Sequence, residues 1–477
     1  MLFNSFHFLI FFPVVVILQF LLPQRLQLVW LVLASCYFYM ALIPVYILVL
    51  FALILVDFGA GIAIENARGR RRKFFLVISL IANISVLGFF KYFNFFNGNA
   101  AALAQALHLP YSLHNLDFVL PIGLSFHTFQ SMAYTVEVYR RRWPAERNLL
   151  KYALYVLFWP QLVAGPIERP QNLLPQFARR HGFDYDRVVD GLRLMLIGFF
   201  KKCVIADRLT MVVDPVYSRP DSYHGAALLL ATYAFAFQIY YDFSGYTDIA
   251  LGAARVSGFR LMQNFRQPYL ASSVSEFWQR WHISLSTWFR DYLYIPLGGS
   301  RVPRPRHFFN LLVVFAVSGF WHGAQWTYLA WGTLHGIFLV GAIATQSWRD
   351  RLTEVLGLNR FPRLLFGVRV FCTFNLVSFA WIFFRATSLS SALLIVGRIC
   401  AFGLAGVGSI GAYNFGIAIA GMSVLALLHF GRPGRLDGSV LAFESATARF
   451  MNYCFLSLVI LIFGRLYMQQ SFIYFQF

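Results

Sequence analysis

Apolar stretches long enough to cross a membrane recur along almost the whole chain, and they constrain the fold more than any other feature. A hydrocarbon core about 30 Å thick is spanned by roughly 20 apolar residues of helix. Hydrophobic residues make up 59% of the chain and charged residues only 13%, which excludes an ordinary soluble protein. The candidate spans are 8–22, 28–42, 43–63, 74–97, 117–136, 225–243, 308–322, 326–345, 364–384 and 451–467. The sequence therefore predicts an all-α polytopic membrane protein.

Further segments are apolar but less decisive, and they lie at 149–165, 190–206, 388–406 and 412–429. With these the chain is expected to make about eleven or twelve crossings, with one or two re-entrant pieces besides. Several candidates are shorter than a lipid-facing helix needs, which favours helices buried inside a thick ring of protein. Because no repeat or soluble domain is apparent, residues 1–477 are expected to form a single membrane domain.

Positive charge is concentrated between the apolar stretches. The chain has 40 Lys and Arg against 20 Asp and Glu, a net charge of +20. In a soluble protein this excess would suggest nucleic acid, but basic loops on the cytoplasmic side are usual for multispanning proteins, and no nucleic-acid partner is expected. The runs 68–73 and 140–142 and the arginine-rich segment 246–308 are therefore expected to face the cytoplasm. A basic mouth that attracts an anionic substrate is the alternative reading.

Several familiar motifs are missing from the sequence. It contains no Walker A sequence, no G-x-S-x-G and no H-E-x-x-H, so the usual equipment of ATP-driven transport and zinc hydrolysis is absent. The five cysteines are scattered without the spacing of a metal site, and no metal is expected.

Histidines beside apolar segments are the most informative polar residues, because ionisable groups in a membrane are costly and often functional. His322 lies in 319–324 (GFWHGA), where the glycines allow a close approach of backbone or substrate. Histidine can accept and return a proton near neutral pH, as general acid–base catalysis requires. His282, in the arginine-rich segment, is the second candidate. For His335 and His127 structural hydrogen bonding is the favoured interpretation, and it stays open as an alternative for His322 and His282.

Two other polar clusters interrupt apolar runs. Residues 240–248 (YYDFSGYTD) place two carboxylates and several hydroxyls at the end of a span. Residues 158–170 contain three prolines, which suits a broken or re-entrant helix. Each cluster either lines a substrate pathway or forms a structural corner.

At these residues the sequence resembles the membrane-bound O-acyltransferase family, and within it the bacterial alginate O-acetyltransferase type. The resemblance covers most of the chain, and its motifs occur in the family's order. They are 121–130 (PIGLSFHTFQ), 160–166 (PQLVAGP), 241–248 (YDFSGYTD), 276–299 (EFWQRWHISLSTWFRDYLYIPLGG), 319–324 (GFWHGA), 381–386 (WIFFRA) and 472–477 (FIYFQF).

The resemblance implies a ring of about eleven or twelve tilted helices, with re-entrant or interfacial helices around a central tunnel. It also implies a motif-bearing catalytic core at about 117–386. His322 matches the family's catalytic histidine and His282 its second motif residue. The wider family often has Asn or Asp at the second position, whereas bacterial exopolysaccharide-type members have His there, as this chain does.

The residues also suggest roles in an acyl transfer. The reaction needs a base for a hydroxyl proton and a group that stabilises the developing oxyanion, and His322 is the expected base. The remaining candidates shape a narrow tunnel, attract the anionic donor or orient other groups. These candidates are Trp278, Trp281, Trp321, Arg290, Asp291 and Asp242.

The predicted function is transfer of an acyl group, expected to be acetyl, from a cytoplasmic thioester to an extracytoplasmic acceptor during polysaccharide O-acetylation. The donor would be acetyl-CoA as a substrate, with no bound cofactor, and the partner a periplasmic acetyltransferase or another polysaccharide-modifying protein. The protein would lie in the bilayer of a bacterial inner membrane as a multi-pass enzyme. One alternative is transfer of D-alanyl or another acyl group from a carrier protein. An alternative of another class is a polysaccharide or small-molecule transporter without chemistry.

Overall fold

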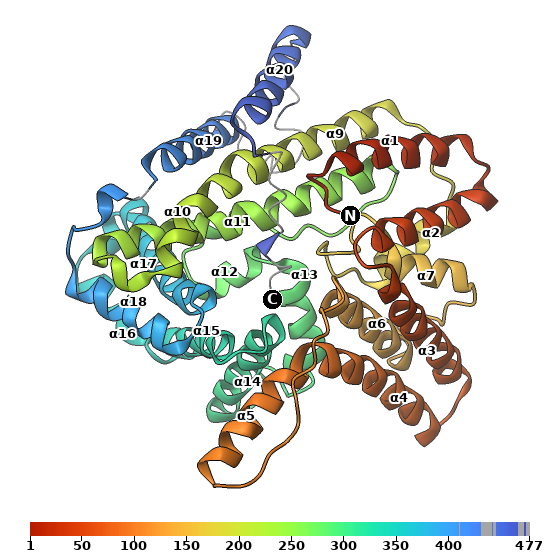
Figure 1. The fold of residues 1–477 in the computed structure, drawn as a ribbon, viewed down its shortest axis with the longest axis horizontal. Coiled ribbons are helices and arrows are strands. Elements are labelled where there is room, and N and C mark those ends of the chain that lie inside the picture. The colour runs from red at the N-terminus through yellow and green to blue at the C-terminus, as the bar shows by residue number, and fades with distance from the viewer. Residues whose placement is uncertain (410, 431–440, 442–444, 466–471, 474–477) are drawn as a thin grey trace. The chain divides into compact units, whose positions relative to one another are not determined.

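The computed structural model describes residues 1–409, 411–430, 441, 445–465 and 472–473 (Figure 1). All the longer regular elements in these ranges are helices, which confirms the all-α prediction. The described chain divides into two compact units. Among the described residues, unit 1 comprises Met1–Met195 and Thr247–Met262, and unit 2 comprises Leu196–Tyr246 and those within Gln263–Ile473.

Unit 1 contains the first half of the helices. They are α1 (Phe6–Leu21), α2 (Gln24–Met40), α3 (Ile47–Asn66), α4 (Arg70–Leu87), α5 (Phe93–Ala106), α6 (Leu124–Tyr139), α7 (Leu149–Leu157), α8 (Pro170–Leu173) and most of α9 (Tyr185–Phe199). Local signals set several of these limits. The Ser5 hydroxyl accepts a hydrogen bond from the backbone N–H of Phe8 at the start of α1. Gly69, at φ 58°, separates α3 from α4.

The predicted span 117–136 is helical only from Leu124 onward. Pro121 and Gly123 precede the helix, and Gly123 has φ 78°, a conformation that favours glycine. A Cβ atom at this glycine would stand 2.6 Å from the carbonyl oxygen of Leu162, so the chain also passes too close for a side chain. The same close approach brings α6 against the segment that follows α7.

That segment, 158–169, is not helical, which agrees with the interruption predicted from the three prolines of 158–170. Its residues are nonetheless buried, and Glu168 is completely inaccessible. The Glu168 carboxylate accepts hydrogen bonds from the Asn172 side chain, at 2.6 Å, and from the backbone N–H of Met262. Irregular backbone inside a membrane protein is tolerated where protein surrounds it, and here protein does.

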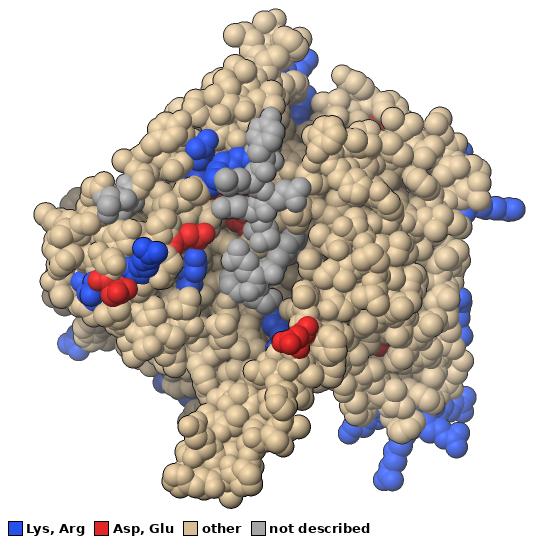
Figure 2. Space-filling model, in the orientation of Figure 1, with Lys and Arg blue, Asp and Glu red and all other residues tan. Residues whose placement is uncertain are grey.

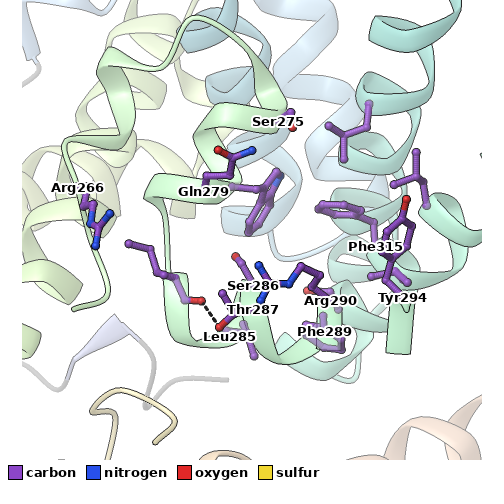
Figure 3. Close-up of a pocket in the computed structure, with 16 residues that line it drawn as sticks. Arg266, Ser275, Gln279, Leu285, Ser286, Thr287, Phe289, Arg290, Tyr294 and Phe315 are labelled. Carbon is purple, nitrogen blue, oxygen red and sulfur yellow. Dashed lines mark hydrogen bonds between the residues drawn. The ribbon is translucent and has the colours of Figure 1, made fainter. Parts of the chain in front are cut away.

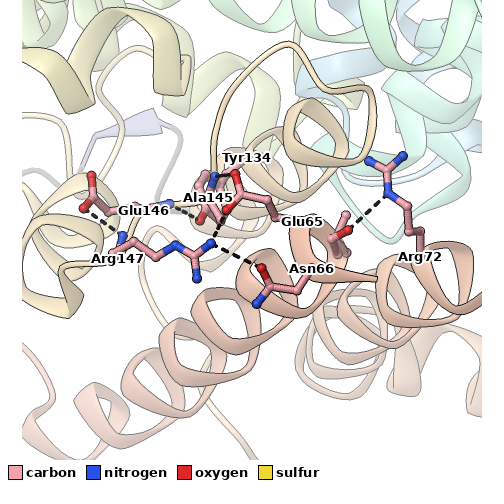
Figure 4. Close-up of polar contacts among 8 residues, drawn as sticks. Glu65, Asn66, Arg72, Tyr134, Ala145, Glu146 and Arg147 are labelled. Carbon is pink, nitrogen blue, oxygen red and sulfur yellow. Dashed lines mark hydrogen bonds and ion pairs between the residues drawn. The ribbon is translucent and has the colours of Figure 1, made fainter. Parts of the chain in front are cut away.

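The two basic runs predicted to share a face of the membrane meet in unit 1. The guanidinium group of Arg72 donates hydrogen bonds to the carbonyl oxygens of Ile64, at 3.1 Å, and of Tyr139, at 2.8 Å. Arg147 pairs with Glu65, which also accepts a hydrogen bond from the backbone of Ala145 at 3.0 Å (Figure 4). The end of α3 and the end of α6 therefore lie at one face, as the shared orientation of their basic runs requires.

Unit 2 contains the helices that carry the histidine motifs. They are η4 (Phe200–Ala206), α10 (Asp207–Ser218), most of α11 (Gly225–Val256), α12 (Val274–Arg280), α13 (Ile283–Phe289), η7 (Arg290–Tyr294), α14 (Arg304–His322), α15 (Trp326–Ala344), α16 (Gln346–Val355), α17 (Pro362–Arg385), α18 (Leu389–Ala401), α19 (Ala412–Phe430) and α20 (Ala446–Phe463). Between α11 and α14 the arginine-rich segment is thus a series of short helices and turns.

Glycines hold α14 and α15 close together. A Cβ atom at Gly319 would lie 2.3 Å from the carbonyl oxygen of Tyr328, and one at Gly332 would lie 2.2 Å from that of Phe315. Small residues allow helix backbones to approach in membranes, and no larger side chain fits at either position. This contact brings the end of α14, with His322, against the first turns of α15.

By length and composition, six helical segments in the described ranges could each cross a membrane. They are Pro44–Asn66, Arg70–Ala106, Gly225–Val256, Trp326–Ala344, Pro362–Arg385 and Ala446–Phe463. Shorter apolar helices occupy Phe6–Leu21, Leu389–Ala401 and Ala412–Leu428. The surface agrees with a lipid environment, because few charged side chains appear on the face drawn in Figure 2 and large apolar side chains such as Leu48 and Ile81 are exposed. The protein is therefore a multi-pass membrane protein, while the larger number of about eleven or twelve crossings stays a prediction.

Candidate active site

His322 is the last residue of α14 and is 4% exposed. Its ring stands edge-on to Trp321 and to Trp331 of α15, with both ring centroids 5.0 Å away. Phe384 of α17 lies 5.7 Å from it in the same manner. Three helices therefore build an apolar aromatic surround for one imidazole, and the predicted neighbour Trp321 is part of it.

Trp278 is positioned by a well-capped short helix. The Ser273 hydroxyl accepts a hydrogen bond from the backbone N–H of Glu276 at 3.1 Å, and the Glu276 carboxylate accepts one from the backbone N–H of Ser272 at 2.7 Å. Together they fix the start of α12. The indole N–H of Trp278 then donates to Nδ1 of His335 at 3.3 Å. Its ring centroid also lies 5.8 Å from that of Trp331, so α12 joins the surround of His322.

Trp281, one turn further on, reaches the same cluster through α17. Its ring lies 5.2 Å from that of Trp381, and Trp381 stacks on Trp331 with centroids 5.5 Å apart and planes 17° apart. The sequence prediction did not include Trp331 and Trp381 among the site residues. The available signals were the position of Trp331 one helical turn before His335 and the place of Trp381 at the start of the 381–386 motif.

His282 lies between α12 and α13 and is completely buried. Its backbone has φ 42° and ψ 55°, in the left-handed region that side-chain-bearing residues seldom adopt outside functional or strained positions. The backbone N–H groups of Ile283 and Ser284 donate to the main-chain and side-chain oxygens of Asn264, at 3.0 and 3.2 Å, which holds the turn. Burial lowers the pKa of His282 to about 3, so its imidazole is neutral at physiological pH.

A continuous path of ring contacts joins the two motif histidines inside unit 2. Every step between centroids is 5.5 Å or less. The rings in order are His322, Trp331, Trp381, Trp281, Phe265, Phe243 and His282. The structure therefore brings His322, Trp321, Trp278, Trp281 and His282 together into one connected cluster.

A cavity of about 480 Å³ opens beside this cluster. Its lining comes from α12, α13, η7, α14, α15 and the irregular segment between α11 and α12, and it includes Trp278, Ser318, Arg266 and Arg290 (Figure 3). Ser318 stands one turn before His322 on α14. Arg290, which is half-exposed, donates to the carboxylate of Asp291 at 2.8 Å. The cavity thus combines cationic side chains with an apolar aromatic wall that touches the histidine cluster.

Asp242 has different neighbours from the other predicted site residues. Its carboxylate lies 2.5 Å from Nζ of Lys202 and accepts a hydrogen bond from the backbone N–H of Ile473 at 2.9 Å. Lys202 also pairs with Asp207 at 2.9 Å, and the Phe472 ring lies 4.4 Å from its ammonium group. These contacts are those of a helix-packing partner in the core of unit 2.

Known proteins match this chain over most of its length. The model of the membrane-bound O-acyltransferase family matches residues 76–385. A probable alginate O-acetylase, AlgI, of Pseudomonas aeruginosa is 38% identical over 89% of this chain and 79% of its own length. A peptidoglycan O-acetyltransferase of Helicobacter pylori is 35% identical over 77% and 72%, respectively. A teichoic acid D-alanyltransferase of Streptococcus thermophilus is 28% identical over 55% and 68%.

The match covers both histidine motifs, the helices α12 to α17 and all the residues that line the cavity. It agrees with a buried imidazole, an aromatic surround and several membrane-spanning helices. The chain belongs to the membrane-bound O-acyltransferase family, and it is an O-acyltransferase.

Proposed function

We propose that this enzyme transfers an acetyl group from a cytoplasmic thioester, through a tunnel across the bacterial inner membrane, to an extracytoplasmic acceptor in polysaccharide O-acetylation. The observation that carries the proposal is the position of His322. It is buried in an aromatic cluster of which one member, Trp278, also lines a cavity with two arginines. Relatives whose names specify O-acetylation, of alginate and of peptidoglycan, support acetyl as the group transferred.

His322 acts as the general base in this proposal. It removes the proton of an acceptor hydroxyl as that oxygen attacks the thioester carbonyl, and it returns the proton to the departing thiolate. The apolar surround excludes water, which protects the thioester from hydrolysis and strengthens electrostatic interactions in the site.

His282 has a supporting role in this proposal. Its neutral imidazole joins the ring path to His322 through Phe243, which gives it a place in the same cluster. We assign it the positioning of the acceptor or of a second proton, with residues 117–386 as the catalytic core.

The donor enters by the cavity of Figure 3 in this proposal. Arg290 and Arg266 attract the phosphate groups of acetyl-CoA, and the pantetheine arm lies along the aromatic wall. Asp291, which pairs with Arg290, sets the direction of that guanidinium group. The product is passed to a periplasmic acetyltransferase or another polysaccharide-modifying partner.

A D-alanyl or other acyl group delivered by a carrier protein is the second candidate. The relative named teichoic acid D-alanyltransferase favours it, although its identity of 28% is lower than the 38% of the alginate O-acetylase. The transporter alternative is set aside, because the family is one of acyltransferases.

The test is acyl transfer from radiolabelled acetyl-CoA by purified protein in detergent. Wild type is compared with His322→Ala and with His114→Ala, an exposed histidine that serves as control. Label transfer or thioester hydrolysis by wild type and control alone supports both the donor and the base. Wild-type transfer by His322→Ala would contradict the assignment of the base. If all three folded proteins are silent, the donor is a carrier-protein thioester or the partner is required.

A further inference from the structure

Three buried N–H groups in the aromatic cluster that contains His322 have no acceptor among the residues that the structure describes. They are Nε1 of Trp331, Nε1 of Trp381 and Nε2 of His335. Trp331 and Trp381 are each 1% exposed, and His335 is completely inaccessible. Buried donors without a partner are uncommon in folded proteins, because each loses its hydrogen bonds to water without replacement.

The tautomer of His335 follows from its hydrogen bond with Trp278. Trp278 donates to Nδ1, so in the neutral imidazole Nδ1 is the acceptor and the proton lies on Nε2. Nε2 is therefore a donor, as the two indole nitrogens are. The three groups are alike in offering a hydrogen and accepting none.

These three side chains pack on one another. The Trp331 ring centroid lies 5.5 Å from that of Trp381 and 5.2 Å from that of His335, and the last two are 6.5 Å apart. Trp331 also contacts His322, with 5.0 Å between centroids. A single indole of this kind also occurs in unit 1 at Trp159, among phenylalanines, so one such group is no evidence of a site. What distinguishes the cluster is that three donors adjoin each other, and that one of them, Trp331, contacts the proposed base.

We propose that these donors receive the carbonyl oxygen of the acyl thioester, and that the indole N–H of Trp331 is the oxyanion donor of the reaction. The inference rests on the proposed role of His322. A thioester carbonyl oxygen only accepts hydrogen bonds, which matches a set of groups that only donate. It also gains negative charge in the transition state, where a fixed donor in an apolar site is most effective.

The transfer forms one C–O bond and breaks one C–S bond. The acceptor hydroxyl oxygen bonds to the thioester carbonyl carbon while its proton passes to His322. The C=O electron pair moves to oxygen, and the resulting oxyanion is held by Trp331. When that pair returns, the C–S bond breaks, and the thiolate leaves with the proton from the imidazolium. Trp381 and His335, whose rings contact that of Trp331, act as positioning residues that hold Trp331 and the ground-state carbonyl.

The test uses the purified full-length protein with acetyl-CoA, and it compares Trp331→Phe with Trp159→Phe. Both substitutions remove a buried indole N–H from an aromatic cluster, but only the first removes it beside His322. We expect kcat to fall by about 10²–10³-fold in Trp331→Phe with little change in KM, the usual consequence of losing one oxyanion donor. Trp159→Phe and wild type should have the same kcat. Trp381→Phe and His335→Gln should show smaller losses.

A second measurement compares two ligands on wild type, so its main result does not require a variant. S-acetonyl-CoA carries a ketone oxygen, and S-propyl-CoA has the same chain length without it. Wild type should bind the ketone about tenfold more tightly than the thioether, and Trp331→Phe should lose that preference. Equal binding of the two analogues by wild type would overturn the proposal. So would a wild-type kcat in Trp331→Phe.

Failure of this inference and failure of the proposed function give different results. If His322→Ala is inactive and Trp331→Phe is fully active, the base is correct and the oxyanion assignment is wrong. If His322→Ala is fully active, the proposed base itself is wrong.

Discussion

The indole nitrogen of Trp278 lies 3.3 Å from Nδ1 of His335, and this hydrogen bond ties the arginine-rich segment to the membrane-spanning helix α15. It links the lining of the cavity, where Trp278 lies, to the ring cluster around His322. Trp278 and His335, which are 57 residues apart in sequence, are thereby held in contact.

Trp278→Phe should lower both the stability of the protein and its activity. The substitution leaves Nδ1 of His335 buried without its donor, which costs about 1–3 kcal/mol. We expect a lower melting temperature and reduced acetyl transfer, measured by thermal unfolding in detergent and by the labelled acetyl-CoA assay. Trp348→Phe, at a residue 66% exposed on α16, is the matched control and should change neither quantity. Unchanged stability and activity in Trp278→Phe would show that the hydrogen bond does not contribute to the free energy of unfolding.

Gly332→Ala should separate α14 from α15. Its new methyl group would stand 2.2 Å from the carbonyl oxygen of Phe315, so one backbone must move, at a cost of about 1–3 kcal/mol or more. Because Trp331 adjoins the substituted position, activity should fall together with stability. Gly341→Ala lies on the same helix where no other atom comes within 4 Å of the new methyl group. That control should be neutral or slightly stabilising, since alanine favours helix.

Lys202→Met should destabilise unit 2 strongly. The ammonium group neutralises Asp207 and Asp242, and all three side chains are 5% exposed or less. Removing one partner of a buried ion pair costs about 3–5 kcal/mol, because a charge is left without compensation. Asp214→Asn breaks the more exposed pair with Arg385 and should cost no more than about 1 kcal/mol. Chemical unfolding of the two variants side by side measures the difference in their free energies of unfolding. Equal losses of stability would contradict the larger contribution expected of the buried pair.

Arg290→Glu should raise the KM for acetyl-CoA without a matching fall in kcat. The charge reversal places a carboxylate at the cavity where the donor's phosphates are proposed to bind. The effect should shrink as ionic strength rises, because half-exposed charges are screened by salt. Arg360→Glu, at an exposed position on η8 (Leu358–Arg360), is the control and should keep the wild-type KM. A KM in Arg290→Glu that is wild-type at low salt would place the donor elsewhere.

Hydropathy and local signals were sufficient to predict several of the long helices. Apolar runs marked the helices now assigned to α3, α11, α15 and α17, and the prolines of 158–170 marked a non-helical interruption. The start of α6 at Leu124 was missed, because the close approach to Leu162 that demands Gly123 depends on a contact distant in sequence.

The sequence by itself determined the membrane class, the all-helical architecture, the family and the choice of His322, because hydropathy, capping and motif order are properties of neighbouring residues. Only the tertiary structure revealed that Trp331 and Trp381, which are fifty positions apart, stack beside that histidine. Likewise it paired Asp242 with Lys202 and with the backbone of Ile473. Such contacts depend on how each helix is rotated and how closely the glycines let α14 and α15 pack. Neither can be predicted from a short stretch of sequence, because both depend on residues distant in the chain.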